Sequence, residues 1–138
     1  MAKKRATSKL TVPGPIDPVQ AAAWSNTLIA AYDACAERRH VEARQILAQL
    51  PPCVIRTRDA GVHYGKVVWI GDKIICVEND YRIWQWQGGP LSLSAVASVG
   101  IGNSSRVDGP TATAWIYDVI EVLPCTQAAS ESVESCTP

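Results

Sequence analysis

The feature that most constrains the fold is the spacing of turn residues between positions 53 and 94. This stretch holds three of the five tryptophans and most of the glycines of the chain. Short apolar runs alternate there with Ala60-Gly61, Gly71-Asp72 and Asn79-Asp80, residue pairs that favour tight turns. The pattern predicts an antiparallel meander of four strands. The expected strands span residues 54–58, 62–70, 73–78 and 81–87.

The residues before the meander predict a helical hairpin. Asp17 ahead of Pro18 marks a helix start, because the carboxylate accepts from free backbone N–H groups and proline suits the first helical position. The first helix is expected over residues 18–38, with an apolar stripe of Trp24, Leu28, Tyr32 and Cys35. A second helix follows and ends at Pro51 and Pro52. With no second copy of this unit in the chain, the stripe docks on the sheet or on another subunit.

After the meander the pattern predicts a short helix or turn near Ser92 or Ser94, a polar loop over residues 100–110, and a last strand from Thr113 to Leu123. The expected fold is α+β, an N-terminal helical hairpin packed on a small antiparallel sheet or half-open barrel. The predicted segments are a disordered basic arm (1–16), the hairpin (17–52), an antiparallel β-domain (53–125) and a flexible tail (126–138).

The composition indicates a globular protein whose net charge creates no overall electrostatic attraction to nucleic acid or acidic lipid. The chain has 13 Lys and Arg and 13 Asp and Glu, so any binding of nucleic acid has to be local. The N-terminal arm, with Lys3, Lys4, Arg5 and Lys9, is the candidate for such binding. The simpler interpretation of this arm is a solubilising tail. The apolar runs of the chain are far shorter than the roughly 20 residues that a membrane-spanning helix needs. Without a secretory pattern at the N-terminus, a cytoplasmic location is expected. The five cysteines lack CxxC spacing and are expected to be free thiols.

The candidate site lies on the fourth predicted strand. Alternation places Arg82, Trp84 and Trp86 on one face. Indoles that stack on a base and a guanidinium that pairs with phosphate suit a planar anionic ligand such as a nucleotide. The alternative is that the two tryptophans belong to the core or to a subunit interface, with the arginine at the rim.

Three residues of other strands complete the candidate ligand-binding set. Arg56 of the first strand joins Arg82 if the two strands lie close in the sheet. His63 and Tyr64 belong to the second strand. No nucleophile and base stand at catalytic spacing, and two histidines without clustered Cys or Asp do not indicate a metal site. We therefore expect no catalytic residues, no metal, no cofactor and no enzymatic activity.

Three segments resemble a family of small uncharacterised proteins encoded by tailed bacteriophages and prophages. The family pattern is R-T-x-x-A-G-V-x-x-G, then R-I-W-x-W-x-G, S-L-S, and a last strand similar to E-V-I-E-I-I-P-C-T. The first matching segment here begins at Arg56, the second begins at Arg82 and includes Ser92, and the third begins at Val119. The resemblance spans about residues 53–133. It implies a phage origin and a host-cytoplasm location, and it carries no activity.

These observations lead to one function with two alternatives. The leading hypothesis is a host-takeover or anti-defence factor that sequesters or occludes a ligand, such as a nucleotide signal, without catalysis. The first alternative is a protein-interaction or assembly module that acts as a homo-oligomer through its tryptophans and helical stripe. The second is a nucleic-acid accessory protein that uses the basic arm. A membrane partner is not expected.

Overall fold

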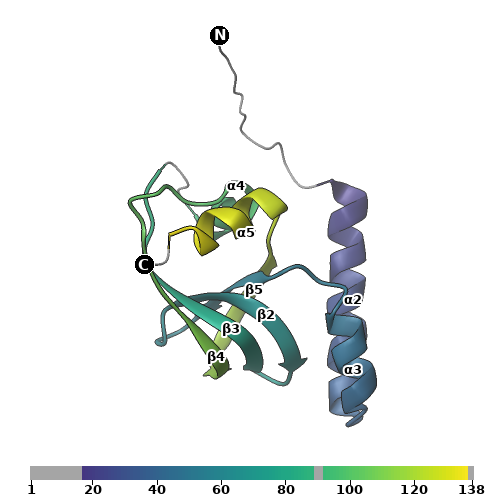
Figure 1. Cartoon of the computed structure of the whole chain (residues 1–138). Coiled ribbons are helices and arrows are strands. Elements are labelled where there is room, and N and C mark those ends of the chain that lie inside the picture. The colour runs from purple at the N-terminus through teal and green to yellow at the C-terminus, as the bar shows by residue number, and fades with distance from the viewer. Residues whose placement is uncertain (1–16, 89–91, 137–138) are drawn as a thin grey trace.

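The computed structural model describes residues 17–88 and 92–136. They form an α+β fold with one five-stranded antiparallel sheet, as predicted (Figure 1). The helices are α2 (Pro18–Ala36), α3 (His40–Leu47), α4 (Leu93–Val99) and α5 (Gln127–Glu134), and the strands are β1 (Cys53–Thr57), β2 (Val62–Ile70), β3 (Ile74–Gln85), β4 (Arg106–Tyr117) and β5 (Val119–Pro124). None of the helices in these ranges is long and apolar enough to cross a membrane. The predicted basic arm lies outside the described residues.

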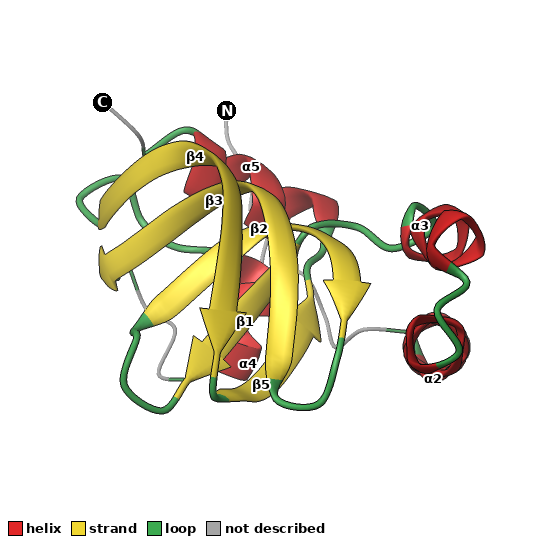
Figure 2. Ribbon diagram, turned by 90° about the horizontal axis from the view of Figure 1, so that it is seen from below, coloured by secondary structure: helices red, strands yellow, loops and turns green. Residues whose placement is uncertain are grey.

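The sheet has the strand order β4-β3-β2-β1-β5, and every neighbouring pair is antiparallel. Asp118 alone separates β4 from β5, although these strands form the two opposite edges of the sheet. Its backbone has φ 56°, in the left-handed region that sharp turns use. A chain that passes from one edge to the other in one residue requires a strongly curved sheet, and Figure 2 shows that curvature.

This curved sheet buries opposite faces at different points along β2. Tyr64 packs in one apolar cluster with Val96 of α4 and Val133 of α5. Val67 packs in a second cluster with Ala31 of α2 and with Leu47, which ends α3. Residues three apart on a strand point to opposite faces, so each pair of helices covers its own side of the sheet.

Helix α2 begins where the sequence predicted. The Asp17 side chain accepts a hydrogen bond of 3.0 Å from the backbone N–H of Val19, with Pro18 in the first turn. The apolar stripe differs from the prediction at one position. Ala31 is fully buried, whereas Tyr32 is 43% exposed. The stripe turns slightly around the helix because the small alanine permits a closer approach to the sheet and to α3, which lies beside α2 (Figure 2).

Polar contacts also hold α3 on the sheet. The Lys66 ammonium of β2 donates to the carbonyl oxygens of Leu47 and Ala48, at 3.2 and 3.3 Å, and to that of Leu50. A cation at a helix C-terminus meets carbonyls that have no partner within the helix. Burial of this ammonium lowers the pKa of Lys66. Arg44 adds an ion pair of 2.5 Å to Glu78.

The predicted turn at Asn79-Asp80 is wrong. β3 continues through both residues, and its pairing with β2 shifts between Tyr64 and Lys66 to accommodate an extra residue. Asn79 has φ 53° at this bulge. An asparagine that adopts positive φ serves a bulge as well as a hairpin turn, so the residue types alone did not distinguish them.

Two predictions after residue 100 are also corrected. The expected polar loop contributes its residues from Arg106 onward to β4, which pairs along the length of β3. The expected flexible tail forms α5, whose Ala129 and Val133 are fully buried. Thr126 caps that helix by accepting from the backbone N–H of Ala129. The tail is ordered because its apolar residues fall on one helical face that completes the first cluster.

Candidate ligand surface

The strongest candidate for binding is an exposed patch on β3 and β4, made of Arg82, Trp84, Arg106 and Asp108, which we call the Trp84 surface. Trp84 is 59% exposed. The guanidinium carbon of Arg82 lies 5.3 Å from the centroid of its ring, within cation–π range. The indole Nε1–H donates to the Asp108 carboxylate at 2.5 Å. The two contacts fix the orientation of a large ring that faces solvent.

Strand pairing explains why these residues meet. Arg82 lies opposite Asp108, and Gln85 lies opposite Arg106. The register shifts between Ile83 and Gln85, so Trp84 occupies a bulge. A bulge re-aims a side chain, which here brings Trp84 out to the charged groups of β4.

The same bulge overturns one prediction. Strict alternation placed Trp86 on the face of Arg82 and Trp84. One extra residue reverses the alternation beyond it, and Trp86 is half-buried against the cluster that contains Ile83. Trp86 is therefore a packing residue, as in the alternative interpretation, while Trp84 is open.

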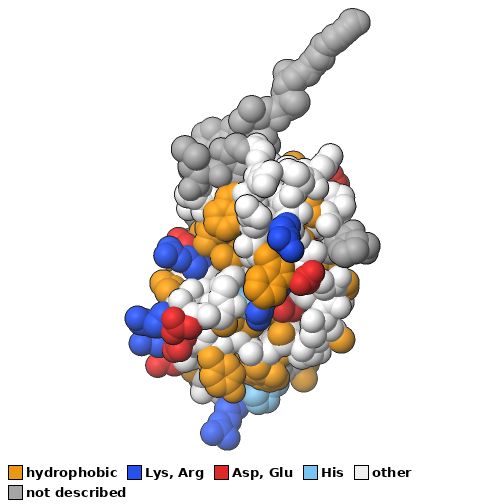
Figure 3. All heavy atoms as spheres, turned by 90° about the vertical axis from the view of Figure 1, so that its left-hand side faces the viewer, with side chains coloured by type: hydrophobic (Ala, Val, Ile, Leu, Met, Phe, Trp, Pro, Cys, Tyr) orange, Lys and Arg blue, Asp and Glu red, His pale blue; other side chains and the backbone are white. Residues whose placement is uncertain are grey.

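The Trp84 ring stands between two hollows. One has a volume of about 400 Å³ and is lined by Trp84, Gln85, Arg106 and Asp108. The other, of about 220 Å³, has Asp80 and Thr111 in its lining beside Arg82 and Trp84. Figure 3 shows this side of the molecule, where basic, acidic and hydrophobic side chains lie interleaved. Each of the two hollows that Trp84 lines therefore offers space for a small ligand beside the indole ring.

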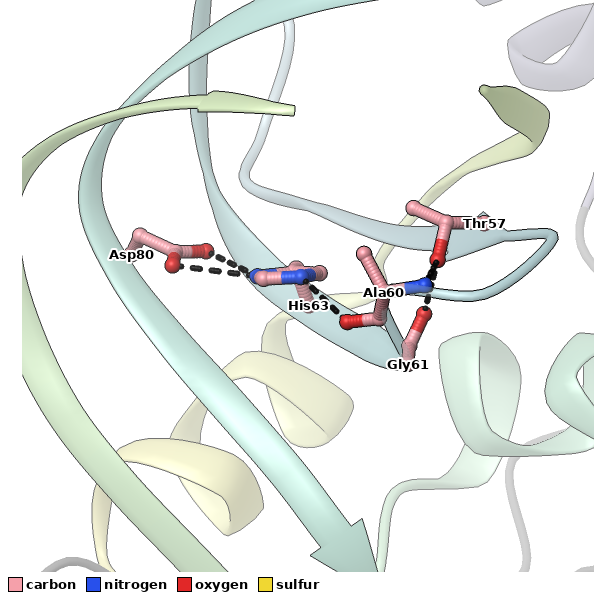
Figure 4. A network of polar contacts seen from close by, with 5 residues as sticks. All are labelled: Thr57, Ala60, Gly61, His63 and Asp80. Carbon is pink, nitrogen blue, oxygen red and sulfur yellow. Dashed lines mark hydrogen bonds and ion pairs between the residues drawn. The ribbon is translucent and has the colours of Figure 1, made fainter. Parts of the chain in front are cut away.

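His63 lies under this surface and is not open to a ligand. It is 3% exposed, and its Nδ1 faces both carboxylate oxygens of Asp80 at 2.9 and 3.0 Å (Figure 4). Its Nε2 faces the backbone carbonyl of Ala60 at 3.0 Å. Both ring nitrogens therefore lie within hydrogen-bond distance of oxygen atoms. The pair therefore acts as a buried structural link between β2 and β3.

Thr57 extends this network into the β1–β2 turn. Its Oγ1 donates to the carbonyl of Gly61 and accepts from the N–H of Ala60, each at 2.8 Å. Gly61 has φ 85°, which favours glycine. The turn aims the Ala60 carbonyl at His63 (Figure 4). The Thr, Ala and Gly of the first motif thus have a structural role.

Tyr64 is also unavailable to a ligand. It is fully buried, and its hydroxyl donates to the Glu134 carboxylate of α5 at 2.5 Å. Burial, and then the bond to Glu134, raise the pKa of Tyr64 well above its ordinary value. This residue fastens α5 to the sheet.

Arg56 is exposed but does not join the Trp84 surface. It pairs with Val62 of β2 and Glu121 of β5, while Arg82 pairs with His63. The β2 strand lies between the two arginines, and they fall in adjacent rows whose side chains point to opposite faces. The anion site built from both arginines is therefore not formed within this chain.

Two members of the surface were absent from the sequence prediction. Arg106 and Asp108 fall in the segment that was expected to be a loop. The available signal was the alternation of Arg106, Val107 and Asp108 just before the final β-branched run. Pairing of that segment with β3 was needed to place them beside Trp84.

Two buried thiols of the fold are poor nucleophiles, since burial raises the pKa of Cys125 to about 12 and also raises that of Cys53. Within residues 17–88 and 92–136, no three His, Cys, Asp or Glu side chains come together as a metal site. What the surface offers is a planar ring, two guanidinium groups and a carboxylate.

Comparison with known proteins assigns the chain to a family. No curated protein and no solved structure matches it. The profile of the family described as Domain of unknown function (DUF6948) matches residues 50–133, which are 84 of the 138 residues (133 − 50 + 1). That range contains β1 to β5, the Trp84 surface and most of α5. The chain therefore belongs to the DUF6948 family.

Proposed function

We propose that this protein is a phage-encoded, non-enzymatic binding factor that acts in the host cytoplasm in host takeover or against host defence. It sequesters or occludes a ligand of nucleotide type at the Trp84 surface. The observation that carries the proposal is the exposed, oriented indole of Trp84 beside Arg82 and bordered by a hollow that Arg106 lines. The phage origin rests on the resemblance in the motifs.

The energetics of the surface suit a small planar anion. Stacking of one base on an aromatic side chain contributes about 1–3 kcal/mol. A guanidinium paired with phosphate adds a charge-assisted hydrogen bond. The Asp108 bond to the indole reduces the entropy that Trp84 would lose on binding. Arg106 has no ion pair among the described residues and is available to an anionic group.

Calorimetry with a panel of mononucleotides and cyclic nucleotides tests the proposal on the full chain. Trp84→Ala should weaken binding at least about tenfold, the equivalent of one stacked base. Tyr117→Ala is the matched control, because Tyr117 is similarly exposed at 63% and lies at the opposite end of β4 from Arg106. No heat with any nucleotide, or an equal loss from both variants, would reject the ligand.

A second candidate, a self-associating assembly module, is favoured by a separate observation. Three large apolar side chains of the edge strands are more than half exposed, namely Trp115, Tyr117 and Ile120. Exposed aromatic residues of this kind are enriched in subunit interfaces. Light scattering at increasing concentration separates the two candidates. A strict monomer at all concentrations rules out the module, whereas a dimer that Tyr117→Ser dissociates supports it.

The finer architecture belongs to the same proposal. We propose that α2 and α3 act as one helical hairpin and that the five strands form a half-open barrel. The passage of the chain from β4 at one edge to β5 at the other supports the barrel. A solved structure in which the β4 and β5 edges stand far apart, as in a flat sheet, would contradict it.

A further inference from the structure

Another hollow lies at the opposite end of β3 from the Trp84 surface. It has a volume of about 530 Å³, within the range of small-molecule sites. It is bounded by the α2–α3 connection and the β2–β3 turn, which lie at the same end of the molecule (Figure 1). Its lining includes two aromatic residues, three charged or polar residues and a glycine, namely Tyr32, Trp69, Arg38, His40, Asp72 and Gly71.

One wall of this hollow is a fixed aromatic ring. Trp69 packs on one side against a small cluster of Ala34, Cys35 and Ala43. Its ring is tilted against that of Trp115, with centroids 5.8 Å apart. A Cβ on Gly71 would lie 2.3 Å from Cζ3 of Trp69, so the turn approaches the ring as closely as a residue without a side chain allows. Since the ring is held from three directions, it is pre-organised to stack on a ligand.

The polar groups around the hollow have no partner in the described structure. The side chains of Arg38, His40 and Asp72 make no hydrogen bond or ion pair with any described residue. The neighbouring Arg39 differs, because its guanidinium is paired with both Glu37 and Glu42. Arg39 therefore has exposed carboxylate partners, whereas Arg38, the residue before it, has none among the described residues. Arg38 adopts φ 60°, a conformation uncommon for a residue with a side chain.

We propose that this hollow is a second binding site, for a small planar ring that carries a negative charge. The ring stacks between Trp69 and the half-exposed Tyr32. Arg38 pairs with the anionic group and His40 donates to it, while Asp72 accepts from a hydroxyl or amino group of the ligand. An aromatic carboxylate and a nucleoside monophosphate both present this chemistry. The α2–α3 residues of the site precede residue 50, so the site adds a function to the sheet of the family.

Equilibrium titration of the full chain, followed by tryptophan fluorescence and calorimetry, tests the site. The probes are adenosine monophosphate and indole-3-acetate, with uncharged adenosine and inorganic phosphate as partial ligands. At least one of the charged aromatic probes is expected to bind at least about tenfold more tightly than either partial ligand, because ring and charge act together. Tighter binding of adenosine monophosphate indicates a nucleoside monophosphate as the ligand class, whereas tighter binding of indole-3-acetate indicates an aromatic carboxylate.

Variants locate the site. Arg38→Gln should weaken binding about tenfold or more, and Arg39→Gln, the matched control, should change it less than about twofold, since one charge-assisted hydrogen bond corresponds to that difference. Tyr32→Leu provides a second test, because Tyr32 is 43% exposed and the proposed ligand stacks on its ring. This variant should also weaken binding. Trp84→Ala should leave this affinity unchanged.

The outcomes separate this inference from the function proposed above. Binding that Trp84→Ala abolishes and Arg38→Gln leaves intact overturns the second site and supports the Trp84 surface. Equal loss from Arg38→Gln and Arg39→Gln shows nonspecific attraction to charge and also overturns it. No binding of either charged aromatic probe by the natural chain rejects the site outright.

Discussion

Two polar clusters lie next to one another on β3, and they differ in how much water reaches them. In the buried one, the side chains of His63 and Asp80 are 4% and 8% exposed, and both ring nitrogens of His63 face an acceptor. In the outer one, Trp84 is 59% exposed, and Arg106 has no ion pair among the described residues. A buried polar group must be partnered to be tolerated, whereas a group kept for recognition is left partly free. The first cluster therefore specifies the fold, and the second is available to a ligand.

The largest expected effect comes from breaking the buried pair. His63→Ala leaves the Asp80 carboxylate buried without its partner, which should lower the free energy of unfolding by about 3–5 kcal/mol. Urea denaturation followed by circular dichroism measures this. His40→Ala is the matched control on an exposed histidine and should change stability by less than about 0.5 kcal/mol. Equal effects from the two variants would contradict a structural role for the pair.

The next effect tests how closely β2 and β3 approach beside that pair. A Cβ on Gly65 would lie 2.4 Å from Cγ1 of Val77 and 2.9 Å from the Asn79 carbonyl oxygen. Gly65→Ala should therefore destabilise the protein by about 1–3 kcal/mol through overpacking. Thermal denaturation compares it with Gly61→Ala, where the space is open but φ is 85°. A Gly65→Ala protein as stable as the natural one would show that the strands separate freely.

A smaller effect is expected in the turn that supports His63. Thr57→Val keeps the shape of the side chain but removes the hydroxyl that bonds Gly61 and Ala60. The loss should be about 1–2 kcal/mol, because the Ala60 N–H loses its acceptor and the Gly61 carbonyl loses one of its two donors. Thr113→Val, on an exposed part of β4, should have almost no effect in the same denaturation experiment. If the two threonines prove equivalent, the turn does not position His63.

The smallest effect on stability is expected at the outer cluster. Trp84→Ala removes an exposed ring and should change the free energy of unfolding by less than about 1 kcal/mol, as surface substitutions usually do. The same substitution should weaken nucleotide binding by more than it lowers the stability of the protein. A strong loss of stability in urea denaturation would instead identify Trp84 as a packing residue.

Local signals in the sequence predicted much of the fold. Asp17 was predicted as a helix cap, and Ser92 or Ser94 as a second, because such side chains satisfy free N–H groups; Asp17 and Ser92 accept these bonds. The turns at Ala60-Gly61 and Gly71-Asp72 connect β1 to β2 and β2 to β3 as predicted. These features depend on residues close together in the chain.

Features that depend on distant pairing were missed. The bulge at Trp84 arises from the register between β3 and β4, and nothing local distinguishes it from regular alternation. The order of α5 depends on the cluster that Ala129 and Val133 enter, because a short helix alone is marginal in water. The position of Arg106 beside Trp84 likewise follows from pairing. Of the predicted ligand-binding residues, the structure brings Arg82 and Trp84 together on an exposed surface and packs Trp86 against the first cluster.

The contact between Lys66 and the end of α3 has a consequence for other members of the family. The family match begins at residue 50, after α3, and includes Lys66. Two of its three carbonyl acceptors, those of Leu47 and Ala48, lie at the end of α3 and before the family match, whereas the third, that of Leu50, lies within it. In a homologue without these helices, a lysine at this position would lose two of its three acceptors. Lysine should therefore accompany the helical extension across homologues, so that this single position records whether a chain carries it.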